Sequence, residues 1–188
     1  MNKLQITSYC AASLFTALLC NSVSAQPVQN WTPAMYLQYG TAEHGSDAAT
    51  LGVTIPWKNW NYALGSGLVT GYWDVWGSRW SGDYQGSSRS NWVVGAKPTF
   101  RWRPAQGQSP WFLEAGIGVS YATNHRYVTD HKDFSTRFNF ASHIGVGYLF
   151  GEQQRNELSL RLEHYSNAGI KEPNPGENFL QLRFARHF

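Results

Sequence analysis

The sequence predicts an eight-stranded, antiparallel, up-and-down transmembrane β-barrel, and three observations support this fold class. First, apolar and polar residues alternate with a period of two through most of the chain after residue 25. Second, no run of about 18 apolar residues follows that point, so the sequence offers no membrane-spanning helix. Third, Trp, Tyr and Phe make up 15% of the chain although its mean hydropathy is negative. Aromatic girdles on an alternating wall are typical of membrane barrels.

The first 25 residues are predicted to be a secretory signal peptide. Lys3 supplies the positive start, residues 11–19 contain a short apolar run, and Val23-Ser24-Ala25 has the pattern of a cleavage site. The apolar run is too short to span a bilayer. We therefore expect residues 26–188 to form the mature protein as a single barrel domain.

Composition excludes several classes of function. Both cysteines, Cys10 and Cys20, lie in the predicted signal peptide. The mature chain is therefore expected to have no disulfide, no cysteine-ligated zinc and no thiol nucleophile. The formal net charge of the whole chain is only +3 and no basic run occurs, which argues against a nucleic-acid partner.

Eight segments carry the strand pattern. Between residues 111 and 121, for example, Leu113, Ala115 and Ile117 alternate with Glu114 and Gly116. Most segments match the tilted strand of about 9–11 residues that crosses a bilayer, although the second is short. The predicted strands span residues 33–41, 50–57, 62–73, 90–102, 111–121, 138–150, 156–166 and 178–188.

The more polar face of these strands is predicted to line the barrel interior. Glycines such as Gly95, Gly116 and Gly145 fall on that face. The interior of an eight-stranded barrel is narrow, so small residues leave room for larger neighbours. Charged neighbours need to pair with one another there, and those predicted to point inward are Arg101, Glu114, Arg161 and Arg183.

The lengths of the connections predict the orientation in the membrane. Every second connection is short, whereas long polar connections occur at 74–89 and 122–137. Outer-membrane barrels have short periplasmic turns and longer extracellular loops, so we expect both termini in the periplasm. The terminal Phe188, preceded at alternate positions by Phe184 and Leu182, is similar to the C-terminal signal of bacterial outer-membrane proteins.

A soluble lipocalin-like barrel is the competing architecture. It also has eight up-and-down strands and follows a secretion signal. It would bury the apolar face and expose the polar one, and the alternation alone does not distinguish inside from outside. The glycine-rich polar face, the tryptophan content and the terminal Phe188 favour the membrane barrel.

His164 and Ser166 lie on the face that is predicted to meet lipid. Leu158, Leu160 and Leu162 define that face, and the same parity continues to the histidine and the serine. Residues two apart on a strand have backbones about 6.6–6.8 Å apart, so their side chains can form a hydrogen bond. The alternative is a polar strand end in the headgroup zone, where such residues cost little. A histidine beside a serine is by itself a weak motif.

The segment that follows carries a family resemblance. Residues 164–176, with the sequence HYSNAGIKEPNPG, resemble the active-site segment of the lipid A 3-O-deacylases (PagL family), which are outer-membrane serine esterases. Looser similarity covers most of the mature chain, including LVTGYWD at 68–74 and FLEAGIGV at 112–119. The resemblance implies an eight-stranded barrel that hydrolyses the ester-linked acyl chain at position 3 of lipid A.

The same resemblance implies roles for individual residues. Ser166 would be the nucleophile and His164 the general base, with Asn167 and the backbone near Gly169 as oxyanion-hole donors. An ester carbonyl needs these groups: an activated hydroxyl, a base for its proton and donors for the developing charge. No metal or cofactor is required. Lipid A, or lipopolysaccharide, would reach the site sideways through the outer leaflet.

The third member of the catalytic group is where this sequence departs from the family. The family pattern has a glutamate twelve residues after the serine, and here that position is Asn178, with Glu177 one place earlier. Alternation with Leu180 puts Asn178 on the outer face and Glu177 on the inner one. Asparagine can orient a histidine but cannot stabilise an imidazolium as a charge would. We expect Asn178 to orient His164, with Glu177 as the alternative.

Other polar residues are weaker candidates. Ser142 has outward parity and can approach the site, whereas His143 is expected to be an interior hydrogen-bonding residue. Cations of the outer loops that can meet lipid A phosphates are Arg79, Arg89, Arg126 and Lys132. A metal site in the 122–137 loop is less favoured than simple solvation, and its ligands would be His125, Asp130, His131 and Asp133.

Two functions remain open from the sequence, both in the bacterial outer membrane. The first is a lipid A 3-O-deacylase that acts through Ser166 and His164. The alternative is a non-enzymatic structural or adhesive barrel that binds through its outer loops. The first predicts that changing His164 abolishes function, and the second predicts that only loop changes matter.

Overall fold

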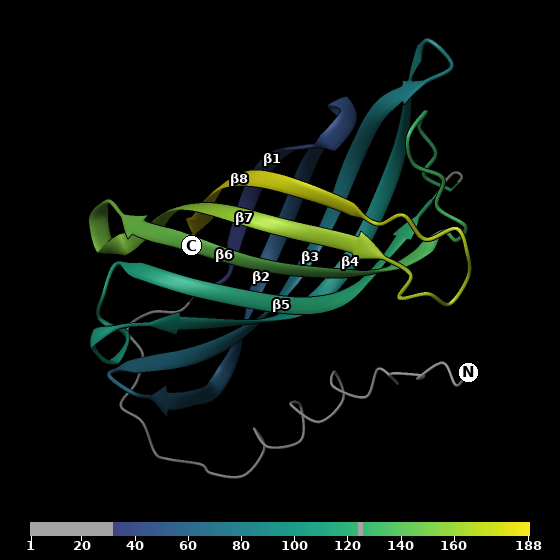
Figure 1. Cartoon of the computed structure of the whole chain (residues 1–188). Coiled ribbons are helices and arrows are strands. Elements are labelled where there is room, and N and C mark those ends of the chain that lie inside the picture. Colours follow the sequence, from purple (N-terminus) through teal and green to yellow (C-terminus); the bar gives the residue numbers. More distant parts are fainter. Residues whose placement is uncertain (1–31, 124–125) are drawn as a thin grey trace, which may run out of the picture.

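The computed structural model describes residues 32–123 and 126–188, and these form one closed barrel of eight antiparallel strands in sequential order. β1 pairs with β8 to close the ring, as Figure 1 shows from the side. The predicted fold class is confirmed, whereas the predicted signal peptide lies outside the described residues. The strands are β1 (Ala34–Ala42), β2 (Asp47–Leu64), β3 (Gly67–Tyr84), β4 (Ser87–Arg103), β5 (Trp111–Ala122), β6 (Phe138–Phe150), β7 (Asn156–Ser166) and β8 (Glu177–His187).

The wall of the barrel is apolar outside and polar inside. On β8, Leu180 and Leu182 are each 54% exposed, whereas Gln181 and Arg183 between them are buried. A soluble barrel would have the opposite polarity because it buries its apolar face, so the lipocalin-like alternative is wrong. Within the two described stretches, no helix is long and apolar enough to cross a membrane.

The charges inside the barrel pair with one another, as the sequence predicts. Asp74 on β3 accepts hydrogen bonds from Arg161 on β7 (Nη1 to Oδ2, 3.1 Å) and from Arg183 on β8 (Nη2 to Oδ2, 3.0 Å). Arg101 on β4 donates from Nη2 to Glu114 Oε2 on β5 at 2.7 Å. The two pairs of Asp74 tie β3 to β7 and β8, which are distant in the sequence, whereas Arg101 and Glu114 join the consecutive strands β4 and β5. Breaking such a buried pair costs about 3–5 kcal/mol because it leaves an uncompensated charge.

The two ends of the barrel differ. The turn end carries the C-terminus and the three short connections 65–66, 104–110 and 151–155. The loop end carries the connections 43–46, 85–86, 123–137 and 167–176. In Figure 1 the C-terminus marks the turn end, and the connection between β7 and β8 stands at the opposite side.

An aromatic cluster fills the barrel at the loop end. The ring of Trp80 packs against Tyr127, Tyr165 and Phe179 with centroids 4.5–5.1 Å apart, and all four side chains are buried. Tyr127 comes from the 123–137 loop, so this loop covers the barrel mouth. The interior is therefore occupied by the ion pairs and, above them, by this aromatic cluster.

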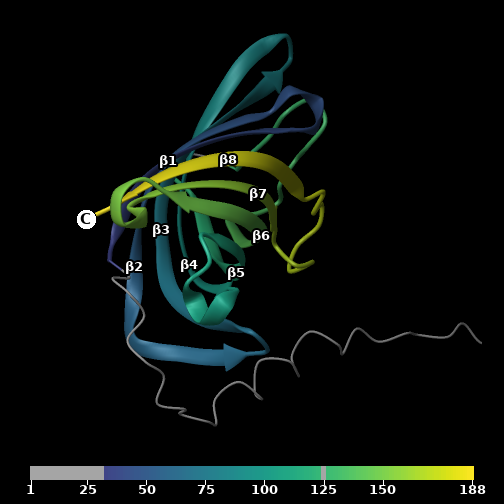
Figure 2. The same cartoon turned by 90° about the vertical axis from the view of Figure 1, so that its left-hand side faces the viewer.

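The hairpin of β3 and β4 is the largest correction to the prediction. The segment 74–89 was expected to be a long loop, but the two strands stay paired as far as Tyr84 and Ser87. Gln85 and Gly86 form the connecting turn with φ values of 51° and 74°, as the tight turns of hairpins require. Figure 2 shows this hairpin reaching beyond the rest of the barrel. Trp76 and Trp80 on its inner face stay buried in the barrel, and only its polar tip, at residues 83–88, stands largely exposed.

The boundary between β2 and β3 is a second correction. The turn was expected between residues 57 and 62, but it lies at Gly65-Ser66. β2 continues through a register shift between Pro56 and Asn61, within which Asn59 has a φ of 60°. Proline cannot donate to the ladder and is tolerated at such bulges, so it does not end the strand. The remaining predicted strands agree with the structure at most boundaries to within about one residue, as expected for regular alternation.

Candidate active site

Three polar side chains form a hydrogen-bonded chain on adjacent strands near the loop end. The register pairs His164 on β7 directly with Asn178 on β8. His164 Nδ1 lies 2.7 Å from Asn178 Oδ1, and His164 Nε2 lies 3.0 Å from Ser166 Oγ. An amide oxygen only accepts, so Nδ1 carries the ring proton and Nε2 accepts the hydrogen bond from the serine hydroxyl. This arrangement has the connectivity of a nucleophile, a general base and an orienting group.

The chain of three lies on the outer wall. The side chains of His164 and Asn178 are exposed, in continuation of the row that includes Leu162 and Leu180. Ile144, on the other side of β7, is 63% exposed. A polar group surrounded by such side chains at the outer surface of the barrel faces lipid and not the lumen.

Glu177, the alternative orienter, is turned away from this site. Its side chain is buried on the inner face at 1% exposure, and Lys132 Nζ lies 3.7 Å from its Oε1. Strand alternation therefore extends to the first residue of β8. Of the two candidates, the structure brings Asn178 to His164 and keeps Glu177 on the opposite side of the wall.

Asn167 shapes the turn that follows the serine. Its backbone N–H donates to Asn174 Oδ1 at 2.9 Å. Its buried side chain donates from Nδ2 to Lys171 O at 2.7 Å and to Ser135 Oγ at 3.0 Å. The residue thus links the 167–176 connection to the 123–137 loop beside it.

Gly169, the second expected oxyanion-hole residue, is held by the same turn. Its backbone N–H donates to Asn167 Oδ1 at 2.9 Å, and its φ of 77° lies in the left-handed region that glycine adopts without strain. Ala168 before it also has a positive φ of 55°. The donors that the sequence predicts for an oxyanion therefore have protein acceptors in this structure.

Sequence reasoning missed the contacts of three residues that build this turn, including Lys132, which was expected only to meet lipid A phosphates. They are Asn174 and Ser135, through the bonds to Asn167, and Lys132, whose Nζ donates to Gly176 O at 2.9 Å. Asn174 stands between two prolines, a context that favours turns with side-chain acceptors. Nothing in the sequence around Ser135 and Lys132 indicates their contacts, because both residues come from the separate 123–137 loop.

Of the weaker candidates, Ser142 lies beside the site, whereas His143, Arg79 and Arg89 lie elsewhere. Ser142 lies directly opposite His164 in the register of β6 and β7. His143 is buried in the interior, as predicted, but neither ring nitrogen has a hydrogen-bond partner among the described residues, and Nε2 lies 3.8 Å from Glu114 Oε1. Arg89 packs over the ring of Tyr84, and Arg79 is exposed on β3.

The 123–137 loop does not assemble the considered metal site in the part that the structure describes. There, no group of three or more His, Cys, Asp or Glu side chains is arranged for a metal ion. His131 stacks on His44 with ring centroids 4.2 Å apart, and Asp133 forms an exposed ion pair with Arg126 at 3.4 Å. His125 lies outside the described residues.

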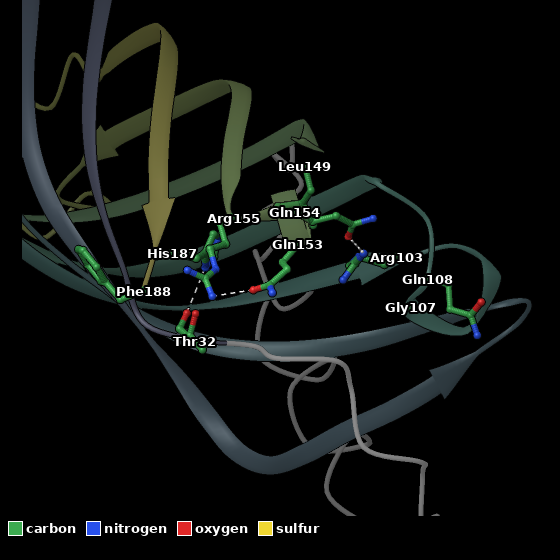
Figure 3. Close-up of a pocket in the computed structure, with 10 residues that line it drawn as sticks. All are labelled: Thr32, Arg103, Gly107, Gln108, Leu149, Gln153, Gln154, Arg155, His187 and Phe188. Carbon is green, nitrogen blue, oxygen red and sulfur yellow. Dashed lines mark hydrogen bonds between the residues drawn. The ribbon is translucent and has the colours of Figure 1, made fainter. Parts of the chain in front are cut away.

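A cavity of about 370 Å³ lies at the turn end, away from the candidate site. Figure 3 shows Arg103 bonded to Gln154 and Arg155 bonded to Gln153 along its rim, with His187 and Phe188 nearby. None of the three residues of the hydrogen-bonded chain lines it. Its lining residues place it at the mouth of the barrel on the side of the C-terminus.

Comparisons with known proteins agree with the fold and place the chain in a family. The family described as "Lipid A 3-O-deacylase (PagL)" matches residues 47–187. The lipid A deacylase PagL of Bordetella bronchiseptica is 33% identical over 174 residues, covering 92% of this chain and 91% of that protein. The lipid A deacylase PagL of Pseudomonas aeruginosa is 34% identical over 127 residues, covering 67% of this chain and 69% of that protein.

A solved structure, described as the crystal structure of the outer membrane enzyme PagL, has a TM-score of 0.70 and 26% sequence identity. The match covers 82% of this chain and 99% of the solved one. Together, the family match and the two relatives establish that this chain belongs to the PagL family of lipid A deacylases.

Proposed function

We propose that this protein is an outer-membrane esterase that removes the 3-O-linked acyl chain of lipid A by serine and histidine chemistry. The observation that carries the proposal is the hydrogen-bonded chain Asn178–His164–Ser166 on the lipid-facing wall. Membership of the family supports lipid A as the substrate and the outer membrane as the location. Family membership and the hydrogen bonds that link Asn178, His164 and Ser166 favour the esterase over a purely structural or adhesive barrel.

The mechanism follows from the positions of the two ring nitrogens. Ser166 Oγ attacks the ester carbonyl carbon while its proton passes to His164 Nε2. The tetrahedral intermediate collapses to an acyl-serine, and the imidazolium gives the proton to the ester oxygen of the sugar, which leaves as a hydroxyl. Water then repeats the sequence: His164 takes its proton, the acyl-serine bond breaks, and the proton returns to Ser166 as the fatty acid departs.

Asn178 holds the imidazole in the productive tautomer in this scheme. Its Oδ1 accepts from His164 Nδ1, which leaves the lone pair of Nε2 directed at the serine. An amide carries no charge, so it stabilises the imidazolium less than a carboxylate would. We therefore expect this chain to work with a weaker orienting interaction than the glutamate of the family pattern would provide.

The oxyanion is assigned to the turn at residues 167–169. Asn167 Nδ2 and the N–H of Gly169 are donors close in sequence to the nucleophile, and both already donate to protein oxygens. To act on the substrate they would exchange these acceptors for the carbonyl oxygen as charge develops on it. The turn is pre-shaped for this by its two left-handed residues, Ala168 and Gly169.

The substrate would approach sideways through the membrane. The aromatic cluster and the interior ion pairs occupy the lumen, whereas His164 and Asn178 are exposed on the outer wall. β7 runs from the turn end to the loop end, so Ser166 lies toward the loop end. With the loop end outside the cell, that position corresponds to the outer leaflet, where lipid A resides.

Mass spectrometry of lipid A tests the proposal directly. A host strain that lacks deacylase activity would express the wild type, Ser166→Ala or the matched control Ser159→Ala, whose serine lies on the inner face of the same strand. We expect loss of the 3-O-acyl chain with the wild type and the control, and intact lipid A with Ser166→Ala. The same loss in all three strains would exclude Ser166 as the nucleophile, and loss from another position would refute the 3-O assignment alone.

A further inference from the structure

Lys132 differs from the other cations of the outer loops because its side chain turns inward. Its side chain is 14% exposed, whereas that of Arg126 in the same loop is 46% exposed. The ammonium donates to the carbonyl oxygen of Gly176 at 2.9 Å. Burying most of a lysine costs free energy, so these contacts must compensate for lost hydration.

Glu177 is the acidic partner of this lysine. Its carboxylate is buried among the described residues. Lys132 Nζ, 3.7 Å from Oε1, is the cation paired with it there. A buried carboxylate without a compensating charge is strongly unfavourable, so the position of Glu177 depends on Lys132. Both contacts of the lysine therefore act on consecutive residues at the start of β8.

The backbone held by Lys132 lies against the catalytic imidazole. Gly176 has a φ of 66°, and a Cβ added to it would lie 2.9 Å from His164 Cε1. Asn178 follows two residues later and reaches His164 Nδ1 through its amide oxygen. A displacement of this short segment would therefore change both the packing of the ring and the hydrogen bond that orients it.

We infer that Lys132 is a positioning residue: by holding the Gly176 carbonyl and the Glu177 carboxylate, it fixes the strand start from which Asn178 orients His164. The inference rests on the proposed esterase function. The position that Lys132 imposes on residue 178 matters more for an asparagine than it would for a glutamate. A carboxylate is drawn to the imidazolium by charge, whereas a neutral amide depends on its geometry.

Steady-state kinetics of the purified barrel in detergent micelles tests this role. Lipid A and dephosphorylated lipid A serve as substrates for the wild type, Lys132→Met, Lys132→Arg and the control Arg126→Met. We expect Lys132→Met to lower kcat by about three- to tenfold on both substrates with little change in KM, because misplaced catalytic groups lose rate and not binding. Lys132→Arg should recover most of the rate, and Arg126→Met should leave the rate on the dephosphorylated substrate unchanged.

A double-mutant cycle with Asn178→Ala separates positioning from any other role. If Lys132 acts through Asn178, Lys132→Met should reduce kcat less than about twofold in the Asn178→Ala background. An equal reduction in both backgrounds would overturn the inference. So would a rise in KM confined to phosphorylated lipid A, because that result would make Lys132 a phosphate-binding residue.

A second variant serves as the control in case Lys132→Met fails to fold. Lys132→Met leaves Glu177 uncompensated, so the double variant Lys132→Met/Glu177→Gln removes both charges and should fold even if the single variant does not. This double variant should still be slow, since the Gly176 carbonyl has lost its donor; a wild-type rate would overturn the inference. A wild type that releases no fatty acid from lipid A would instead refute the proposed function, so the two failures are distinguishable.

Discussion

The two faces of β7 carry two polar systems of opposite kind. On the inner face, Arg161 is fully buried and contacts Asp74, Tyr72 and Glu114, so each of its interactions is backed by others. On the outer face, His164 has one partner at each ring nitrogen and is exposed to the surroundings of the barrel. Arg161 therefore keeps other partners if one is lost, and it is enclosed by the barrel. His164 has no second partner at either ring nitrogen within the described chain.

This difference separates stability from activity. The inner charges hold strands together, and no solvent replaces a lost partner. The outer groups are reached from outside, where a substrate can meet them, and their loss leaves no buried charge. Changes on the outer face are therefore expected to alter turnover without unfolding the barrel. Changes on the inner face are expected to destabilise the barrel.

The largest effect is expected from His164→Ala. Removing the base should lower turnover by about 10⁴- to 10⁶-fold and change the free energy of unfolding by less than about 0.5 kcal/mol. Release of fatty acid from lipid A and urea unfolding in micelles measure the two quantities. Adding Ser166→Ala should cost little more, because the two act as a unit. A large loss of stability in His164→Ala would show that the outer face also contributes to folding, against the expected division between the two faces.

The next effect is the reverse case, Arg161→Met. Asp74 and Glu114 would lose a buried partner, which should cost about 3–5 kcal/mol of unfolding free energy. Ser159→Ala is the matched control on the same face of the same strand. Its buried hydroxyl has no hydrogen-bond partner within the described chain, so its removal should cost much less. Equal stabilities for the two variants would mean that the interior pairs contribute nothing.

Asn178 allows a smaller change on the outer face. Asn178→Ala removes one neutral hydrogen bond, worth about 0.5–1.5 kcal/mol, and should slow turnover about tenfold or less. Asn178→Glu supplies the carboxylate of the family pattern and should raise turnover above wild type, since charge-assisted hydrogen bonds are about twice as strong. Stopped assays of fatty-acid release compare the three proteins. A slower Asn178→Glu variant would indicate that the site is built for an amide.

The smallest effect concerns Gly176→Ala, where backbone strain and the active site meet. The left-handed φ should cost about 1–2 kcal/mol of stability, and the new methyl should push the ring of His164 and slow turnover several-fold. Gly65→Ala is the control, because its φ of 59° is similar and a Cβ there meets nothing within 4 Å. Both variants should lose similar stability, and only Gly176→Ala should lose rate.

The wall of the barrel could be predicted from the sequence because alternation is a local property. Each residue of a strand points opposite to its neighbours, so Leu158, Leu160 and Leu162 fix the outward parity of His164 and Ser166. The same rule predicted that Arg161 points inward and that Asn178 and Glu177 lie on opposite faces. It failed at 74–89 because polar residues fall on both faces of the paired strands there, and the tip of the hairpin, at residues 83–88, stands in water.

The sequence by itself determined the strand count, which face of each strand meets lipid, and the proximity of His164 to Ser166, all of which depend on contacts within one strand or on its period. Only the tertiary structure decided which residue of β8 meets His164, how Asn167 is held, and that Lys132 reaches the start of β8. These contacts join segments 14, 32 and 44 residues apart. Register and loop packing set them, and neither leaves a periodic signal in the chain.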